Sequence, residues 1–158
     1  MKIGVFAGSF CPVTLGHVDS IEKAAKLVDK LYVVVGVNAS KNYAIPLEAR
    51  LNMLQKAILH VKNAEAVAFD GMMTDFCKQV GADVMIKSIR NALDLQSVID
   101  LNDINQSYWQ GETVFVVGSK QLRHVSSSLV RELAGLGQDF SEFVPRICYD
   151  EIKKYLVR

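Results

Sequence analysis

The first 28 residues constrain the fold more than any other part of the chain. Residues 2–7 form a short, largely apolar run that ends at Gly8, which is typical of a buried strand. The next segment, which contains Pro12, cannot continue that strand. From His17 onward, Ile21, Ala24 and Val28 recur at helical spacing. The sequence therefore predicts strand, turn and helix, with His17 in the first helical turn and on the side that packs against the sheet.

This arrangement is suited to binding phosphate. The N-terminus of a helix carries unpaired N–H groups and the positive end of the helix dipole, and both attract anions. The imidazole of His17 can donate to a phosphoryl oxygen, and Gly8 and Gly16 let the backbone approach an anion where a Cβ would interfere. The alternative is that His17 is satisfied by local backbone and that the two glycines only shape a turn.

The rest of the chain alternates in the same way. Further strands are expected over residues 31–37, 65–69, 83–86 and 112–117, and helices over residues 47–61, 72–80, 92–109, 129–136 and 145–157. Pro46 is expected at the first helical position, and Gly81 is expected to end a helix. This alternation predicts a Rossmann-like, doubly wound, five-stranded parallel sheet in a single domain of residues 1–158.

Composition excludes several classes of function. The 18 basic and 17 acidic residues leave a net charge of +1, so no overall field favours nucleic acid or an anionic membrane. The longest apolar run, residues 31–37, is far shorter than the ~20 residues of a membrane helix, and a chain that starts with a folded strand is expected to carry no signal peptide. Cys11, Cys77 and Cys148 are widely spaced and contain no C-x-x-C pair, so a reducing cytoplasm is expected.

Two further groups of residues are candidates for the same site. Lys41, Lys87 and Arg90 each follow a predicted strand, so they can converge on the sheet edge where His17 lies. Nucleotidyl transfer needs fixed positive donors around the reacting phosphates, whereas a single loop lysine is usually a solvated surface charge. Ser126, Ser127 and Ser128 precede a predicted helix; one of them is expected to cap it, and three together offer a second place for a polyphosphate.

Taken together, these motifs resemble a known family. Gly8-Ser9-Phe10 and Thr14-x-Gly16-His17 are similar to the paired signature of the nucleotidyltransferase superfamily. The segments 40–41 and 86–90, Asp94 and the run Ser126-Ser127-Ser128-Leu129-Val130-Arg131-Glu132 extend the resemblance, over nearly the whole chain, to the phosphopantetheine adenylyltransferase family.

The resemblance implies an enzyme of coenzyme A synthesis that transfers AMP from ATP to 4′-phosphopantetheine, giving dephospho-coenzyme A and pyrophosphate. It further implies Mg²⁺ as cofactor, a homo-oligomer that is usually a hexamer, and direct attack by the substrate phosphate without a protein nucleophile. The implied catalytic residues are His17 and Lys41. The implied nucleotide-binding residues are Ser9, Phe10, His17, Ser88, Arg90, Ser126, Ser127 and Ser128, and the implied substrate-binding residues are Ser9, Lys41, Met73 and Lys87.

The chain also departs from the family pattern. Cys11 stands where an aspartate is usual, and Lys87-Ser88-Ile89-Arg90 replaces the usual R-G-x-R. Val98 replaces an acidic residue, and the aromatic residue expected near Leu122 is absent. These departures leave open a homologue that binds nucleotide or coenzyme A but turns over weakly. A cytidylyltransferase for a phosphorylated alcohol is the other alternative, because related cytidylyltransferases share the histidine motif.

Overall fold

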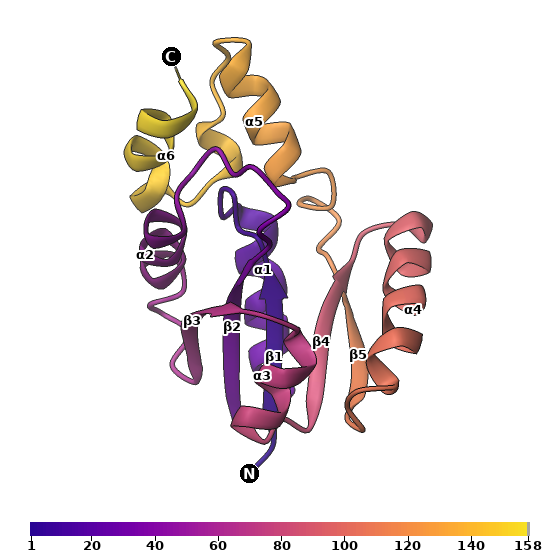
Figure 1. The fold of residues 1–158 in the computed structure, drawn as a ribbon. Coiled ribbons are helices and arrows are strands. Elements are labelled where there is room, and N and C mark those ends of the chain that lie inside the picture. Colours follow the sequence, from indigo (N-terminus) through magenta and orange to yellow (C-terminus); the bar gives the residue numbers. More distant parts are fainter. Residues whose placement is uncertain (158) are drawn as a thin grey trace.

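A five-stranded, all-parallel sheet forms the centre of the computed structural model, which describes residues 1–157 (Figure 1). The strands are β1 (Ile3–Gly8), β2 (Lys30–Val37), β3 (Ala64–Asp70), β4 (Val84–Ile89) and β5 (Glu112–Val117). The main helices are α1 (Leu15–Ala25), α2 (Leu47–Ala57), α3 (Met73–Val80), α4 (Ala92–Gln106), α5 (Ser127–Gly135) and α6 (Tyr149–Leu156). The predicted Rossmann-like fold class is confirmed.

The strand order β3-β2-β1-β4-β5 creates a topological switch between β1 and β4. From β1 the chain winds through α1 to β2 on one side, and from β4 it winds through α4 to β5 on the other. The connections that leave these two neighbouring strands diverge, so a crevice opens at their carboxyl ends. Ligands of open α/β sheets bind in such a crevice.

Two hydrophobic clusters hold the layers together. The larger one joins the sheet to α1, α2, α5 and α6, with Ile21, Leu54 and Ile152 fully buried. The smaller one lies where Phe76 of α3 and Trp109, just after α4, pack against sheet residues such as Met85. Helices therefore cover both faces of the sheet, as the continuously apolar strands predict. Helices α5 and α6 lie beyond the carboxyl edge of the sheet (Figure 1).

Several predicted boundaries are wrong, and at the end of β4 a tertiary contact overrides the local pattern. Strand β4 extends to Ile89 because it stays paired with β5 as far as Val117, so Lys87 and Ser88 belong to the strand. The closing segment is not one helix from residue 145, because two 3-10 turns, Ser141–Phe143 and Arg146–Cys148, come before α6.

Two helix starts and two helix ends also differ from expectation, and one of these ends is that of α4, which stops at Gln106 and not at residue 109. Pro46 is the residue before α2 and not its first helical residue, and α2 ends at Ala57, so His60 lies beyond the helix and contacts Glu22. Helix α5 begins at Ser127, which places two of the three serines inside its first turn. Gly81 does end α3 in the left-handed conformation, with φ of 66°. Among the described residues, no helix has the length and hydropathy needed to cross a bilayer.

Candidate active site

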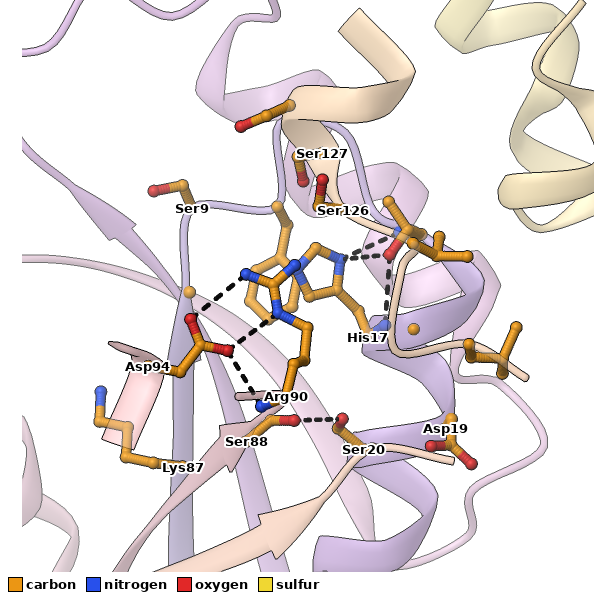
Figure 2. A pocket seen from close by; sticks show the side chains of 18 of the residues that line it. Ser9, His17, Asp19, Ser20, Lys87, Ser88, Arg90, Asp94, Ser126 and Ser127 are labelled. Carbon is orange, nitrogen blue, oxygen red and sulfur yellow. Dashed lines mark hydrogen bonds and ion pairs between the residues drawn. The ribbon is translucent and has the colours of Figure 1, made fainter. Parts of the chain in front are cut away.

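A cavity of about 470 Å³ opens at the switch point between β1 and β4 (Figure 2). Its wall is formed by the carboxyl ends of β1 and β4, the residues after β5, and the first turns of α1, α4 and α5. The lining residues with polar or charged side chains are Ser9, Thr14, His17, Asp19, Ser20, Lys87, Ser88, Arg90, Asp94, Ser97, Ser126, Ser127, Ser128 and Arg131. Segments distant in sequence thus meet where the topology places a ligand.

The side chain of Thr14 begins α1 and also holds His17. Thr14 Oγ1 accepts a hydrogen bond from the backbone N–H of His17 at 3.3 Å, and the backbone N–H of Thr14 donates to Nδ1 of His17 at 3.0 Å. Since Nδ1 accepts that hydrogen bond, the proton of the neutral imidazole resides on Nε2. His17 lines the cavity, so Nε2–H is the donor that its ring can offer to a ligand there.

The ring of His17 is kept neutral by its surroundings. Burial, and then the nearby positive charge of Arg90, lower the pKa of His17 to about 4. Phe10 packs an edge against the imidazole, with 4.9 Å between the ring centroids. Phe10 itself has a φ of 48°, a left-handed conformation that is costly for a residue with a side chain. The turn after β1 thus holds Phe10 in a strained backbone conformation in which its ring contacts the ring of His17.

Two helices begin at the cavity. The backbone of Gly16 in α1 comes so close to the segment before α5 that an added Cβ would lie 3.1 Å from the carbonyl oxygen of Val125. Ser126 caps α5 by accepting from the N–H of Leu129 at 3.1 Å, and Ser127 Oγ donates to the carbonyl of Pro12 at 2.7 Å. Gly16 therefore permits the two helix starts to approach each other. This packing role is additional to the predicted approach of the backbone to an anion. Both helix N-termini face the same space.

Arg90 enters the cavity in a fixed orientation. Its Nε donates to Oδ2 of Asp94 at 3.0 Å, and Asp94 accepts a second hydrogen bond from the backbone N–H of Arg90 at 3.0 Å. The N–H of Asp94 in turn donates to the side chain of Asn91, which caps α4. The ion pair thus ties the end of β4 to the start of α4 and aims the guanidinium toward His17 (Figure 2).

The floor of the cavity carries one cation and a pair of hydroxyls. Lys87 is half-buried, and its burial lowers the pKa of its ammonium group, with Cys77 as a weaker opposing influence. Among residues 1–157, no carboxylate lies within 4.0 Å of Lys87. Ser20 Oγ of α1 and Ser88 Oγ of β4 are 2.8 Å apart. One hydroxyl proton of this pair is used between them, which leaves the other for a ligand.

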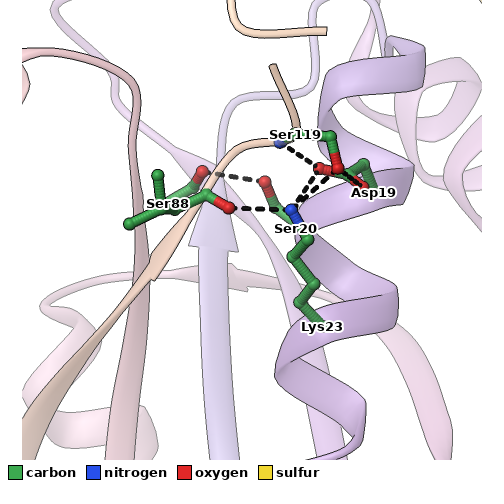
Figure 3. Close-up of polar contacts among 6 residues, drawn as sticks. Asp19, Ser20, Lys23, Ser88 and Ser119 are labelled. Carbon is green, nitrogen blue, oxygen red and sulfur yellow. Dashed lines mark hydrogen bonds and ion pairs between the residues drawn. The ribbon is translucent and has the colours of Figure 1, made fainter. Parts of the chain in front are cut away.

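A separate network fixes the segment after β5 (Figure 3). Asp19 accepts from the N–H of Ser119 at 2.9 Å and from its hydroxyl at 2.6 Å, while Lys23 donates to Asp19 and to the carbonyl of Val117. Burial opposes the charge of Asp19, but the Ser119 and Lys23 contacts outweigh it, so the pKa of Asp19 is lowered. Helix α1 thus holds the segment that leads to the serines of α5.

The structure brings most of the predicted site residues together, but not all. Ser9, Phe10, His17, Lys87, Ser88, Arg90, Ser126, Ser127 and Ser128 all line the cavity. Lys41 lies in the exposed segment after β2, and Met73 is half-buried at the start of α3, packed on the smaller core cluster; neither lines the cavity. Their roles toward a second substrate stay predictions.

Sequence reasoning missed four polar cavity residues, Asp19, Ser20, Ser97 and Arg131. Arg131 donates to the carbonyl of Cys11 at 2.6 Å and to Ser128 Oγ at 3.2 Å. Arg131 lies one helical turn after Ser127, and this spacing could have indicated that it lines the same cavity. Asp19 and Ser20 lie two and three residues after His17, on the first turns of the same helix, and that spacing could have indicated them.

The cavity offers no ready protein site for magnesium. Among residues 1–157, no three His, Cys, Asp or Glu side chains gather closely enough to hold a metal ion. The two carboxylates of the lining, Asp19 and Asp94, are already engaged by Ser119 with Lys23 and by Arg90. The residues present therefore do not fit an all-protein magnesium site.

Comparison with known proteins gives a consistent picture. Residues 5–133 match the family model described as cytidylyltransferase-like. A phosphopantetheine adenylyltransferase of Lachnoclostridium phytofermentans is 38% identical over 156 residues, which cover 96% of each chain. Proteins of the same name from Streptococcus pneumoniae (strain Taiwan19F-14) and Clostridium perfringens (strain SM101) are 40% and 33% identical, over 96% and 99% of this chain and 95% and 96% of theirs.

A solved structure supports the fold alone. A Vibrio parahaemolyticus protein, provisionally assigned as a nicotinate-nucleotide adenylyltransferase, superposes with a TM-score of 0.67 at 17% identity and covers 99% of both chains.

Proposed function

Because the chain belongs to the phosphopantetheine adenylyltransferase family, we propose that it transfers AMP from ATP to 4′-phosphopantetheine, giving dephospho-coenzyme A and pyrophosphate. The chain is an enzyme, a nucleotidyltransferase, and its substrates are ATP and a phosphorylated pantetheine. The family resemblance extends over nearly the full length, and the cavity contains the motifs that carry it.

The observation that carries this proposal best is the orientation of His17. Its Nδ1 is occupied by the N–H of Thr14, so its Nε2–H is a fixed neutral donor beside two helix N-termini. Transfer of a nucleotidyl group needs donors that are in place before negative charge develops on the α-phosphate. His17 meets this need without reorganisation, since its ring is already held by Thr14 and Phe10.

The reaction requires little covalent participation by the protein. An oxygen of the substrate phosphate attacks the α-phosphorus of ATP, and the bond to the β-phosphate oxygen breaks, so pyrophosphate leaves in line with the attack. In this scheme Lys87, Arg90 and Arg131 hold the phosphates, and Nε2–H of His17 stabilises the transition state. Lys41, at the carboxyl end of β2, is proposed to bridge the attacking phosphate and the α-phosphate when both substrates are bound.

We propose that Mg²⁺ enters as part of the nucleotide substrate. Magnesium retains several waters and is commonly bound through one or two carboxylates and substrate phosphates, and here both cavity carboxylates are engaged. Omission of Mg²⁺ from the assay should therefore abolish turnover, and addition of MgATP should restore it.

Pyrophosphate release from ATP that depends on added 4′-phosphopantetheine tests the reaction directly. Purified protein with MgATP should release pyrophosphate only when the second substrate is present, and His17→Ala should lower kcat about 10²- to 10³-fold. The matched control is Lys56→Gln, which removes a cation that pairs with Glu151 outside the cavity and should leave turnover unchanged. Absence of release by the wild-type protein would refute the assignment.

The same assay separates the alternatives. Preference for CTP with a phosphorylated alcohol would indicate a cytidylyltransferase. Tight binding of ATP or coenzyme A without any product would indicate a binding protein that has lost turnover, whereas a measurable rate that His17→Ala abolishes would exclude it.

We propose that the enzyme is a homo-oligomer and that a face formed by α4 and β5 is covered by a second copy. Helix α4 has no buried residue in this chain alone, and Leu101 and Ile104 are exposed on it. Phe115 and Val117 are exposed on β5, an edge strand. Folded proteins usually cover such apolar surface and such edges. Analytical ultracentrifugation should show an oligomer, a hexamer by family resemblance, that dissociates in Ile104→Glu.

The cytoplasm is the proposed location, because Cys11, Cys77 and Cys148 are all free and buried, as is usual for a protein in a reducing compartment.

A further inference from the structure

Arg50 of α2 is a buried cation without an acidic partner. Only 2% of it is exposed, and among residues 1–157 no carboxylate oxygen lies within 4.0 Å of its guanidinium. Its Nε donates to the carbonyl of Ile45 at 3.1 Å, and its Nη1 donates to the carbonyl of Ser9 at 2.8 Å. The ring of Tyr43 covers it, with the guanidinium carbon 4.0 Å from the ring centroid.

Burial of an unpaired guanidinium costs free energy of folding, which suggests that its charge has a functional role. A buried ion is normally paired, because removal from water costs several kcal/mol. Carbonyl dipoles and an aromatic face orient a guanidinium, but they do not cancel its charge. The positive charge of Arg50 therefore acts on its surroundings, and Arg50 contacts the cavity lining at Ser9, whose carbonyl accepts its hydrogen bond.

Arg50 contacts two segments at the same edge of the sheet, one that follows β1 and one that follows β2. Ser9 lies in the turn after β1, directly before Phe10 with its left-handed backbone. Tyr43 and Ile45 lie after β2, in the segment that also contains Lys41. One planar guanidinium contacts both segments at once, because its N–H groups point in fixed, divergent directions. A lysine ammonium retains the charge but not this geometry.

We propose that Arg50 is a positioning residue for the transfer reaction. It fixes the Ser9 turn against the Lys41 segment and places an uncompensated positive charge behind the phosphate site. Arg50 does not line the cavity, so it acts through Ser9 and through the segment that carries Lys41. This inference rests on the proposed function for its kinetic consequence, whereas its structural consequence can be measured without turnover.

The kinetic test compares Arg50→Lys and Arg50→Ala with the wild-type enzyme. A small displacement of reacting groups costs up to about 10²-fold in rate, so Arg50→Lys should lower kcat at least about tenfold and raise the KM for ATP less than about threefold. Lys56→Gln is the matched control on the same helix and should retain wild-type kcat. A folded Arg50→Lys enzyme with wild-type kcat would overturn the proposal.

Chemical rescue separates the charge from simple packing. Millimolar guanidinium should raise the kcat of Arg50→Ala about tenfold, and urea, which has nearly the same shape without the charge, should not. Equal rescue by both compounds, or by neither in a folded variant, would show that the charge has no role. If Arg50→Ala does not fold, the kinetic comparison of Arg50→Lys with the wild-type enzyme tests the proposal.

Hydrogen exchange gives a readout that does not depend on the reaction. In Arg50→Lys, amide exchange should accelerate in peptides that cover residues 8–13 and residues 38–45, while peptides from β3 stay unchanged. Unchanged exchange in both segments would overturn the inference even in an active enzyme. A wild-type protein without turnover would instead refute the proposed function, and the exchange result would still decide the role of Arg50.

Discussion

The backbone N–H of Thr14 and Nδ1 of His17 are 3.0 Å apart, and the Thr14 hydroxyl lies 3.1 Å from the same nitrogen. The residue that starts α1 therefore also selects the tautomer of the residue that faces the cavity. Thr14 is 1% exposed, so water does not compete for these contacts. Thr14 thus both caps α1 and orients the His17 imidazole, through two separate hydrogen bonds.

Replacement of Thr14 by valine tests this coupling. Thr14→Val keeps the backbone N–H but removes the hydroxyl, so it should lower the free energy of unfolding by about 1–2 kcal/mol and lower kcat about tenfold. Thr14→Ser retains the hydroxyl and serves as the control, with kcat close to wild type. Urea denaturation and the pyrophosphate assay measure the two effects. A Thr14→Val enzyme that loses stability but keeps its rate would show that the hydroxyl only caps the helix.

The depressed pKa of His17 predicts a specific loss of stability in acid. The ring titrates at about 4 in the folded protein against 6.5 for an unperturbed histidine. Between these values the unfolded chain binds a proton that the folded protein does not, so the free energy of unfolding should fall as the pH is lowered from about 7 to 4. The contribution is at most about 3.5 kcal/mol, since the two pKa values differ by about 2.5 and one pKa unit corresponds to about 1.4 kcal/mol.

Comparison with His17→Gln isolates this contribution from that of acidic groups such as Asp19. Urea denaturation at several pH values should show a smaller acid-side loss in the variant than in the wild-type protein. Parallel curves for the two proteins would contradict the depressed pKa.

Arg90 is expected to control part of the titration of His17. Burial is the larger cause of the low pKa and Arg90 the smaller one, so Arg90→Gln should raise the pKa of His17 only part of the way toward 6.5. NMR titration of the imidazole Cε1–H signal measures the shift. Lys56→Gln, which removes a cation outside the cavity, should leave the His17 titration in place. A pKa unchanged by Arg90→Gln would mean that burial alone sets it.

The hydroxyl pair of Ser20 and Ser88 should appear as an energetic coupling. Ser20 is 3% exposed, so Ser88→Ala leaves a buried hydroxyl without its partner and should cost about 1–2 kcal/mol. Ser20→Ala should cost a similar amount, and the double variant should cost about 1 kcal/mol less than the sum. Strict additivity in urea denaturation would show that the two hydroxyls do not stabilise each other.

The local sequence pattern predicted those boundaries that depend only on neighbouring residues. Strand β5 was predicted with both of its bounds, because its apolar run is flanked by polar residues. Gly81 was predicted to end α3, since only a residue without Cβ enters the left-handed region freely. The end of β4 was predicted three residues too early, because the pairing of Ile89 with Val117 depends on a strand that follows much later in the chain.

The sequence by itself determined the parallel sheet, the place of His17 at a helix start and the family to which the chain belongs, because periodicity, turn residues and motif spacing are local properties. Only the tertiary structure decided the contacts that complete the site. Arg50 reaches a carbonyl 41 residues away, Asp19 reaches Ser119 and Arg131 reaches Cys11. Such contacts depend on how packed layers orient the turns at one sheet edge, and no local pattern encodes that orientation.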